Sequence, residues 1–206
     1  MCFSATASFI AGGALSATGL LTLSKAKERK ELPLASIPLL FGIQQLIDGI
    51  VWISFGVPAL NTAAIYAYAL FAFVLWPIFI PLSLIAIETK KVRRELLEAL
   101  SLVGLFVGVF FLYFILFGTV AAHIANQCVV YEAPHPYRFE ILAFFLIAIC
   151  GSFFASSKKI LNLFGGALFV SFVVSGWFYL NSFSSVWCFF AAILSVIIYW
   201  YFDTRS

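Results

Sequence analysis

The sequence contains few charged residues. Only 10% of its 206 residues are Asp, Glu, Lys or Arg, whereas 64% are hydrophobic. A soluble globular domain carries about 25% charged and roughly 45–50% apolar residues. The chain therefore lacks the polar surface of a soluble domain, and its apolar runs are long and interrupted only briefly. We expect an integral membrane protein that lies in the lipid bilayer.

Histidine is also scarce, and this limits the classes of enzyme that fit. The chain has two His residues, too few for the seven-span zinc hydrolases, which place several histidines within the membrane. No Ser, His and Asp residues occur at a recognisable catalytic spacing. The net charge of +3 comes from short basic stretches between apolar runs, so we expect no nucleic-acid partner. The sequence does not identify a cofactor.

Seven apolar runs reach the roughly 20 residues that a helix needs to cross a bilayer. They predict a single all-α domain over residues 1–206, made of seven transmembrane helices. The predicted spans are residues 5–24, 34–55, 62–87, 97–121, 138–156, 160–180 and 184–202. Pro77 and Pro81 predict a bend in the third span.

Positive charges predict the orientation of these spans. Every Lys and Arg except Arg138 follows the first, third, fifth or seventh span. By the positive-inside rule these segments face the cytoplasm, which places the N-terminus outside and the C-terminus inside. The opening residues MCFSATASF carry no positive charge, and SKAKERK follows the first span. This order favours a retained helix over a cleaved signal peptide.

The second predicted span carries an unusual polar stripe. Gln44, Gln45 and Asp48 share a helix face with Phe41 and Trp52. A charged side chain at the centre of a span costs about 2.5–3.5 kcal/mol on insertion scales, so it normally faces a partner or a cavity. We expect the stripe to line a ligand-binding pocket in the outer half of the bundle. The alternative is a structural hydrogen-bonding network between helices.

The stretch between the fourth and fifth spans is the longest predicted loop, and it contains side chains able to bind a ligand. These are His123, Cys128, Glu132, His135 and Glu140. Their spacing matches no standard zinc pattern. His123 is the better ligand candidate because the predicted span ends beside it, within reach of Asp48. His135, in APHPY, is expected to shape the loop.

Three of the four cysteines are predicted on the outer side. Cys2, Cys128 and Cys188 are candidates for a disulfide or a reactive thiol, with the pairing left open. Removal of the initiator Met would leave the Cys2 thiol beside an α-amine, and this pair could chelate a metal ion. Cys2, Cys188 and His123 are therefore also considered as metal ligands. Cys150, deep in the fifth span, is expected to pack as a small apolar residue.

The stretches MCFSATASF, PLLFGIQQLIDGIVW and SVWCFF together resemble an uncharacterised family of small bacterial multi-pass membrane proteins. The resemblance covers the whole chain and starts from its first nine residues. It implies the same architecture and a location in a bacterial inner membrane. The resemblance implies no particular activity.

Three kinds of function remain open from these observations. The first is binding or transport of a small solute, a proton or a metal ion through the outer polar pocket. The second is a membrane sensor or assembly factor that does not transport. The third is a membrane enzyme that uses Cys and His chemistry on the outer face, including thiol chemistry or a haem or quinone held by His123.

Overall fold

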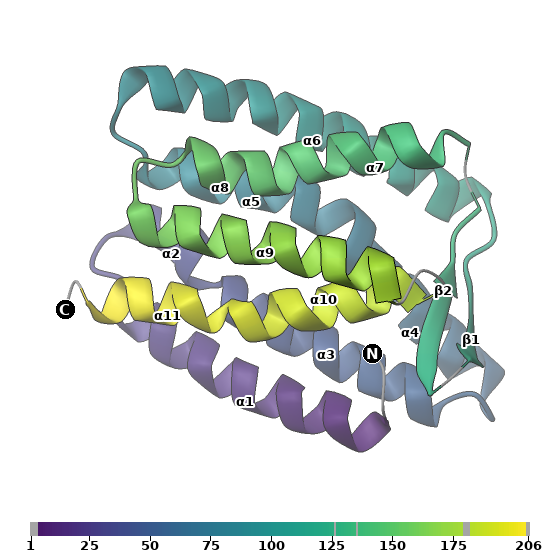
Figure 1. The fold of residues 1–206 in the computed structure, drawn as a ribbon. Coiled ribbons are helices and arrows are strands. Elements are labelled where there is room, and N and C mark those ends of the chain that lie inside the picture. The colour runs from purple at the N-terminus through teal and green to yellow at the C-terminus, as the bar shows by residue number, and fades with distance from the viewer. Residues whose placement is uncertain (1–3, 126, 135, 179–181, 205–206) are drawn as a thin grey trace.

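The computed structural model describes residues 4–125, 127–134, 136–178 and 182–204. In this part of the chain, seven helices are long and apolar enough to cross a membrane. They lie roughly side by side, and a β-hairpin covers one end of the bundle (Figure 1). The predicted number of spans is confirmed. The hairpin is a departure from the all-α prediction.

Several spans are built from more than one segment. The first three consist of α1 (Ala5–Ser24); of η1 (Arg29–Glu31), α2 (Leu32–Ala35) and α3 (Ile37–Ile53); and of α4 (Pro58–Ala69), η2 (Leu70–Leu75) and α5 (Trp76–Ile87). The other four consist of α6 (Lys91–Phe117); of α7 (Arg138–Leu146), η3 (Ile147–Gly151) and α8 (Ser152–Ala155); of α9 (Lys159–Phe178); and of α10 (Phe183–Leu194) and α11 (Val196–Asp203).

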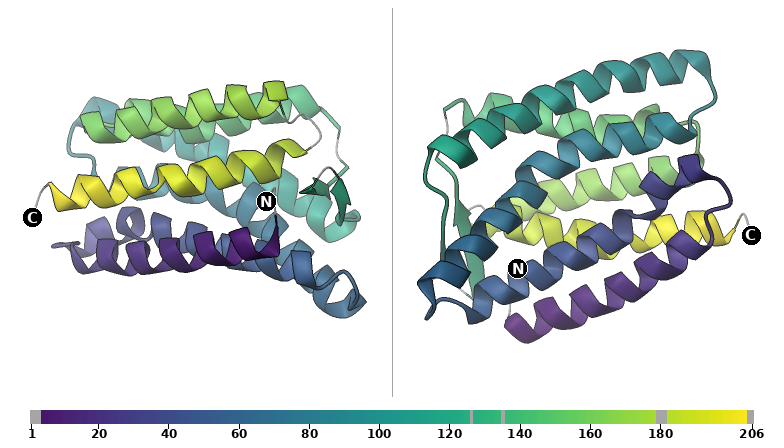
Figure 2. Two further views of the ribbon diagram at one scale, coloured as in Figure 1. Left: turned by 60° about the horizontal axis from the view of Figure 1, so that its bottom comes forward. Right: turned by 180° about the vertical axis from the view of Figure 1, so that it is seen from behind.

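Two of these segments are π-helical. The π-helical segment η2 joins α4 to α5, whose second residue is Pro77, and η3 joins α7 to α8. A π-helix adds a residue to the turn and disturbs the regular hydrogen-bond ladder. The third span is bent along its length (Figure 2), where the sequence predicted a bend from its prolines alone.

The fourth span differs from its predicted bounds. It was expected over residues 97–121, but α6 begins at Lys91 and ends at Phe117. The first two turns of α6 are charged and consist of good helix formers, with Arg94 bonded to Glu98 at 3.2 Å. The helix therefore starts before the apolar run that predicted it.

Glycines let two pairs of helices approach closely. A Cβ atom on Gly42 of α3 would lie 2.5 Å from the Ser16 hydroxyl oxygen of α1. A Cβ atom on Gly104 of α6 would overlap the carbonyl oxygen of Pro77 in α5. Small residues at such crossings allow the backbones to pack at short distance. The α1–α3 contact holds the polar stripe of α3 against the N-terminal turns of α1.

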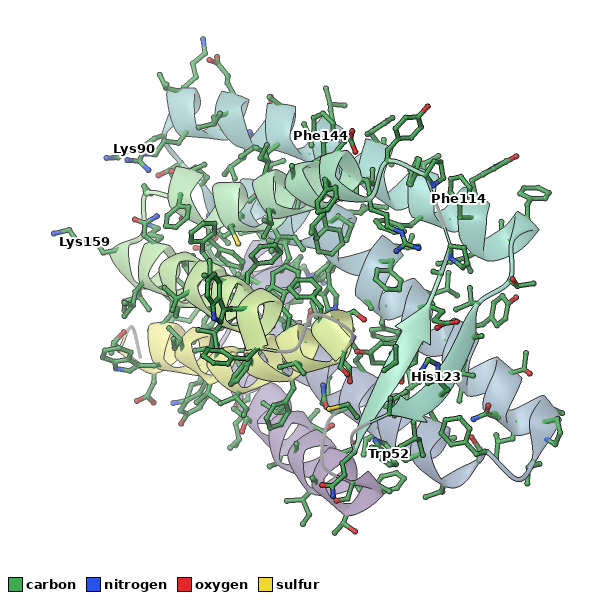
Figure 3. The ribbon with its side chains drawn as sticks, turned by 45° about the vertical axis from the view of Figure 1, so that its right-hand side comes forward. Trp52, Lys90, Phe114, His123, Phe144 and Lys159 are labelled. Carbon is green, nitrogen blue, oxygen red and sulfur yellow. The ribbon has the colours of Figure 1, made fainter. Side chains whose placement is uncertain are left out.

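One end of the bundle carries the basic loops, and polar contacts bind its segments together. Lys90 and Lys159 lie at this end, opposite Trp52 and His123 (Figure 3). The Arg93 guanidinium donates hydrogen bonds to the carbonyl oxygens of Ala155 and Ser156, at 3.0 and 2.7 Å.

The Glu88 carboxylate also connects two of these loops. It accepts hydrogen bonds from the backbone N–H groups of Thr89, Lys90 and Ser157, at 3.0, 3.0 and 2.7 Å. Burial raises the pKa of Glu88, but these hydrogen bonds outweigh burial and bring the pKa below its ordinary value of 4.5. The carboxylate therefore remains ionised and caps both loops.

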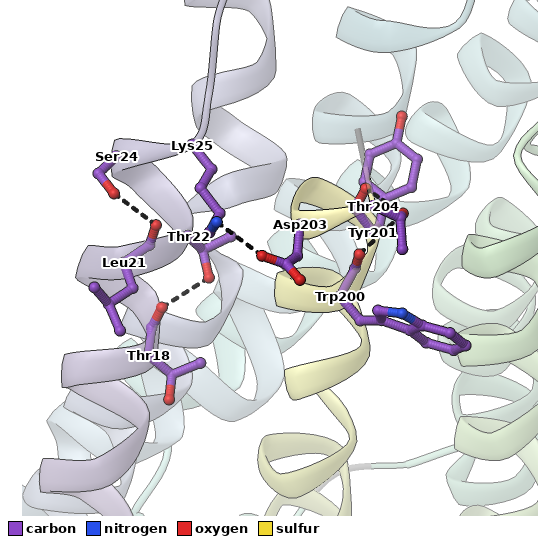
Figure 4. A network of polar contacts seen from close by, with 9 residues as sticks. All are labelled: Thr18, Leu21, Thr22, Ser24, Lys25, Trp200, Tyr201, Asp203 and Thr204. Carbon is purple, nitrogen blue, oxygen red and sulfur yellow. Dashed lines mark hydrogen bonds and ion pairs between the residues drawn. The ribbon is translucent and has the colours of Figure 1, made fainter. Parts of the chain in front are cut away.

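The first and last spans are joined at the same end. The Lys25 ammonium lies 2.8 Å from the Asp203 carboxylate, as Figure 4 shows. The hydrogen bond to Asp203 raises the pKa of Lys25 above its ordinary value of 10.5. This contact closes the bundle between α1 and α11.

At the opposite end, residues predicted as a loop form a β-hairpin. Strand β1 (Ala121–Ala125) pairs antiparallel with β2 (Cys128–Glu132), and His123 lies opposite Val130. Gln127, in the turn, has φ 59°, in the left-handed region that tight hairpins use. The β-branched and aromatic residues of CVVYE favour a strand. Because β2 is almost wholly buried, the hairpin forms part of the packed structure.

Candidate functional site

Asp48 is completely buried between three elements. It belongs to α3 and is 0% exposed. The Ser8 hydroxyl of α1 donates a hydrogen bond to Oδ2 at 3.0 Å, and the Tyr131 hydroxyl of β2 donates one to Oδ1 at 2.7 Å. Burial and the nearby Asp48 carboxylate raise the pKa of Tyr131 well above its ordinary value of 10.0. Tyr131 therefore keeps its proton and acts as the donor.

The two glutamines of α3 lie beside Asp48, and each is only partly satisfied. Gln44 Oε1 accepts a hydrogen bond from the Trp76 indole N–H at 2.7 Å. Within the described residues, Gln44 Nε2 and Gln45 Oε1 are buried without a hydrogen-bond partner. A buried polar atom left unpaired costs about 1–3 kcal/mol. These glutamines thus have unused hydrogen-bonding capacity, although burying an unpaired polar atom costs free energy.

Tyr68 of α4 connects this cluster to the hairpin. Its ring stacks on the ring of Tyr131, with centroids 3.9 Å apart and an interplanar angle of 6°. The Tyr68 hydroxyl lies close to Cys188, Gln44 and Asp48, but within the described part of the chain it forms no hydrogen bond of good geometry. The buried polar cluster, defined as Gln44, Gln45, Asp48, Tyr68 and Tyr131, therefore contains both satisfied and unsatisfied groups.

A cavity of about 840 Å³ lies next to the buried polar cluster. Pockets for small molecules have volumes of about 300–1,000 Å³, so this cavity has the size of a ligand site. Most of its wall is apolar and much of that is aromatic. The aromatic residues that line it are Phe41, Phe73, Trp76, Phe111, Tyr131, Phe139, Phe145, Phe153, Phe164, Phe183 and Trp187.

The cavity changes in character along the bundle. His123, Glu132 and Arg138 line it at the end covered by the hairpin. Phe153 and Phe164 line it toward the opposite end, near the start of α9. The interior is thus apolar at depth and charged at one end. That gradient matches a molecule with an apolar body and a polar head.

Both π-helical segments contribute to the cavity wall. Ala72 and Phe73 come from η2, and Ile149 comes from η3. π-Helical turns occur often at functional sites, because they place side chains where a regular helix would not. The irregular turns of the third and fifth spans therefore meet at the same space.

Three wall residues, one of which belongs to the buried polar cluster itself, lie between the cavity and the rest of that cluster. They are Trp76, bonded to Gln44; Tyr131, bonded to Asp48; and Cys188, beside Tyr68. Asp48, Gln44 and Gln45 do not themselves line the cavity. The stripe predicted from the sequence is thus brought together in one cluster, but it lies behind the cavity wall.

The remaining ligand candidates, Trp52 and His123, lie at the hairpin end (Figure 3). His123 was expected at the end of the fourth span, within reach of Asp48. It lies instead on β1, and its Nδ1 is 3.7 Å from the Glu132 carboxylate. The hairpin turns this side chain toward the mouth of the cavity, and Tyr131 takes the place beside Asp48. Trp52 does not line the cavity.

The cysteines differ in their bonding. Cys128 is disulfide-bonded, whereas Cys150 and Cys188 are free and buried. The pairings that sequence reasoning considered for Cys188 are therefore wrong. Cys2 and His135 lie outside the described residues. In the described part of the chain, no group of three or more His, Cys, Asp or Glu residues is placed to hold a metal ion.

Sequence reasoning missed most residues of the cavity and some partners of Asp48. Ser8, Trp76, Tyr131 and Arg138 were not proposed as site residues, and no short motif marks them. The position of Arg138 alone on the hairpin side was visible in the sequence, and this was the one available signal for the mouth of the cavity.

Comparison with known proteins gives one match. The model of DUF6629, a family of unknown function, matches residues 1–206. Among curated proteins and among solved structures, no match was found. The resemblance to an uncharacterised family is therefore confirmed over the whole chain.

Proposed function

Since the chain belongs to the DUF6629 family, whose function is unknown, we propose its function from its own geometry: it is a membrane protein that binds a small amphiphilic molecule. The observation that carries the proposal is the cavity of about 840 Å³, with aromatic walls at depth and His123, Glu132 and Arg138 at one end. The apolar part of the ligand occupies the aromatic region, and its polar head lies under the hairpin.

Binding is best measured through the tryptophans of the wall. Trp76 and Trp187 line the cavity and are 3% and 6% exposed. In a variant that keeps only these two tryptophans, a spin-labelled fatty acid should quench their fluorescence saturably. Ala191 also lines the cavity, so Ala191→Phe should fill part of it and abolish the saturable quenching.

The matched control is Ala17→Phe on α1, where the side chain is exposed and no cavity residue lies. The fatty acid should quench the tryptophan fluorescence of Ala17→Phe with the same affinity as that of the parent protein. If Ala191→Phe folds normally and is quenched with the same affinity as the parent, the fatty acid is binding elsewhere and the proposal fails.

For the orientation, we propose that the hairpin end and the N-terminus face outward, in a bacterial inner membrane. The basic loops at the opposite end support a cytoplasmic location for that end. Cysteines introduced at exposed Thr119 and Thr89 test this. An impermeant thiol reagent should label Thr119→Cys in intact cells and Thr89→Cys only in opened cells. The reverse pattern would invert the topology.

A second candidate function is the carrying of a proton or a cation by Asp48. It is favoured by the buried Tyr68 hydroxyl, which lies near this carboxyl group and forms no hydrogen bond of good geometry with the described residues. Asp48→Asn in proteoliposomes separates the two candidates. Loss of ion flux with intact folding and intact amphiphile binding supports transport, whereas unchanged flux excludes it. A sensor or an enzyme has no comparable observation in its favour.

A further inference from the structure

Arg138 is isolated from the other positive charges of the chain. Every other described Lys or Arg lies at or beyond the opposite ends of the spans, in the connecting segments or in the first turns of α6 and α9. Arg138 instead begins α7 and lines the cavity at the hairpin end. In membrane proteins, Lys and Arg are disfavoured on the outer side. An interaction within the cavity would explain why a single arginine lies on its wall at this end.

The charge of Arg138 is not neutralised within the described residues. No carboxylate of that part of the chain lies within ion-pair distance of its guanidinium. The other ionisable side chains at the mouth are His123 and Glu132, whose Nδ1 and carboxylate oxygen lie 3.7 Å apart. Glu140, in the first turn of α7, does not line the cavity. Among the residues that the structure describes, Arg138 is thus the one Lys or Arg on the cavity wall, and no carboxylate pairs with it.

The start of α7 adds to this positive potential. The span that begins at Arg138 runs to Ala155, and its N-cap residue, Tyr137, provides no side-chain hydrogen bond. The first backbone N–H groups of a helix are unpaired, and they carry the positive end of the helix dipole. An anion near Arg138 would meet both the guanidinium and these N–H groups.

We propose that Arg138 binds the anionic head, a carboxylate or a phosphate, of the amphiphile whose apolar part occupies the cavity. This rests on the proposed function. The guanidinium fork donates two parallel hydrogen bonds to such a head. The apolar chain then runs from the mouth toward Phe153 and Phe164, away from the hairpin.

The test uses the variant whose only tryptophans are Trp76 and Trp187. Three spin-labelled probes of equal chain length are titrated: a fatty acid, its methyl ester and an alkyl phosphate. One charge-assisted hydrogen bond corresponds to a change of about tenfold or more in affinity. The acid should therefore bind at least about tenfold more tightly than the uncharged ester. The ratio of acid to phosphate affinity identifies which head the site prefers.

Substitution of the arginine then assigns the effect to one residue. Arg138→Gln should weaken the charged probes to the affinity of the ester and leave the ester unchanged. Arg138→Lys should restore part of the preference, because the charge returns without the fork. Arg94→Gln, at the opposite end of the bundle, should leave all three affinities unchanged.

The outcomes distinguish head-group recognition by Arg138 from amphiphile binding in the cavity. If no probe quenches saturably, the amphiphile proposal fails. If acid and ester bind equally, or if Arg138→Gln keeps the preference for the acid, the cavity binds amphiphiles but Arg138 does not recognise their head, and the inference is overturned.

Discussion

Replacement of Tyr131 by phenylalanine tests how the hairpin is held to the bundle. The change deletes one hydroxyl group and keeps the aromatic ring that stacks on Tyr68. Its main loss is the hydrogen bond of 2.7 Å to Asp48. The deleted group is small, so the packing around β2 should remain intact.

The cost follows from the burial of the acceptor. Asp48 is 0% exposed, so no water can replace the hydroxyl without rearrangement. Removing one partner from a buried acceptor costs about 1–3 kcal/mol. In a protein of this length, each kcal/mol lowers the melting temperature by roughly 2–4 °C. Tyr131→Phe should therefore lower it by about 2–12 °C.

The assay is thermal unfolding of the purified protein in detergent, followed by its circular dichroism. The matched control is Tyr113→Phe, because Tyr113 is 56% exposed on the outer surface of α6. It should melt with the parent protein. If Tyr131→Phe also melts within about 1 °C of the parent, far below the shift expected for a lost buried hydrogen bond, Tyr131 does not hold the hairpin to α3.

Three further predictions address the packing, the basic end and the cysteines. Gly104→Ala should destabilise the protein by about 1–3 kcal/mol through overpacking, whereas Gly13→Ala, with open space around its Cβ position, should be neutral or slightly stabilising; equal melting temperatures would contradict this. The pKa of Glu88 is lowered in the folded protein, so its contribution is present above the ordinary value of 4.5 and is lost as the pH falls through the folded value. The stabilities of the parent and Glu88→Gln should therefore differ at pH 7 and converge only as the pH falls below 4.5 and through the lowered pKa of Glu88; a constant difference would exclude this role. Peptide mapping without reductant should recover Cys128 in a disulfide and Cys188 as a free thiol that alkylates only after unfolding, and a Cys188 disulfide would refute the assignment.

The sequence was sufficient for the spans but not for the cavity. Long apolar runs identify membrane helices because crossing the bilayer requires them, whatever their neighbours. The bounds of α6 were wrong because hydropathy detects the apolar run, whereas the helix continues through its charged first turns. The β-hairpin was missed because a short, partly apolar strand pair resembles any loop between two spans.

The polar stripe shows the same limit at the level of single residues. Helical periodicity correctly placed Gln44, Gln45 and Asp48 on one face of one helix. Which residues face them depends on contacts far apart in sequence, such as that between Asp48 and Tyr131. Periodicity carries no information on such contacts, so a polar stripe behind a wall and a polar stripe lining a pocket have the same sequence pattern.

Ligand binding in the aromatic cavity is tested most directly by native mass spectrometry of the protein purified from the membranes of the cells that produce it. We expect one bound amphiphile per chain in the parent and in Ala17→Phe, and its loss from Ala191→Phe. The same occupancy in all three proteins, or no bound amphiphile in the parent, would contradict the claim that the aromatic cavity is a ligand site.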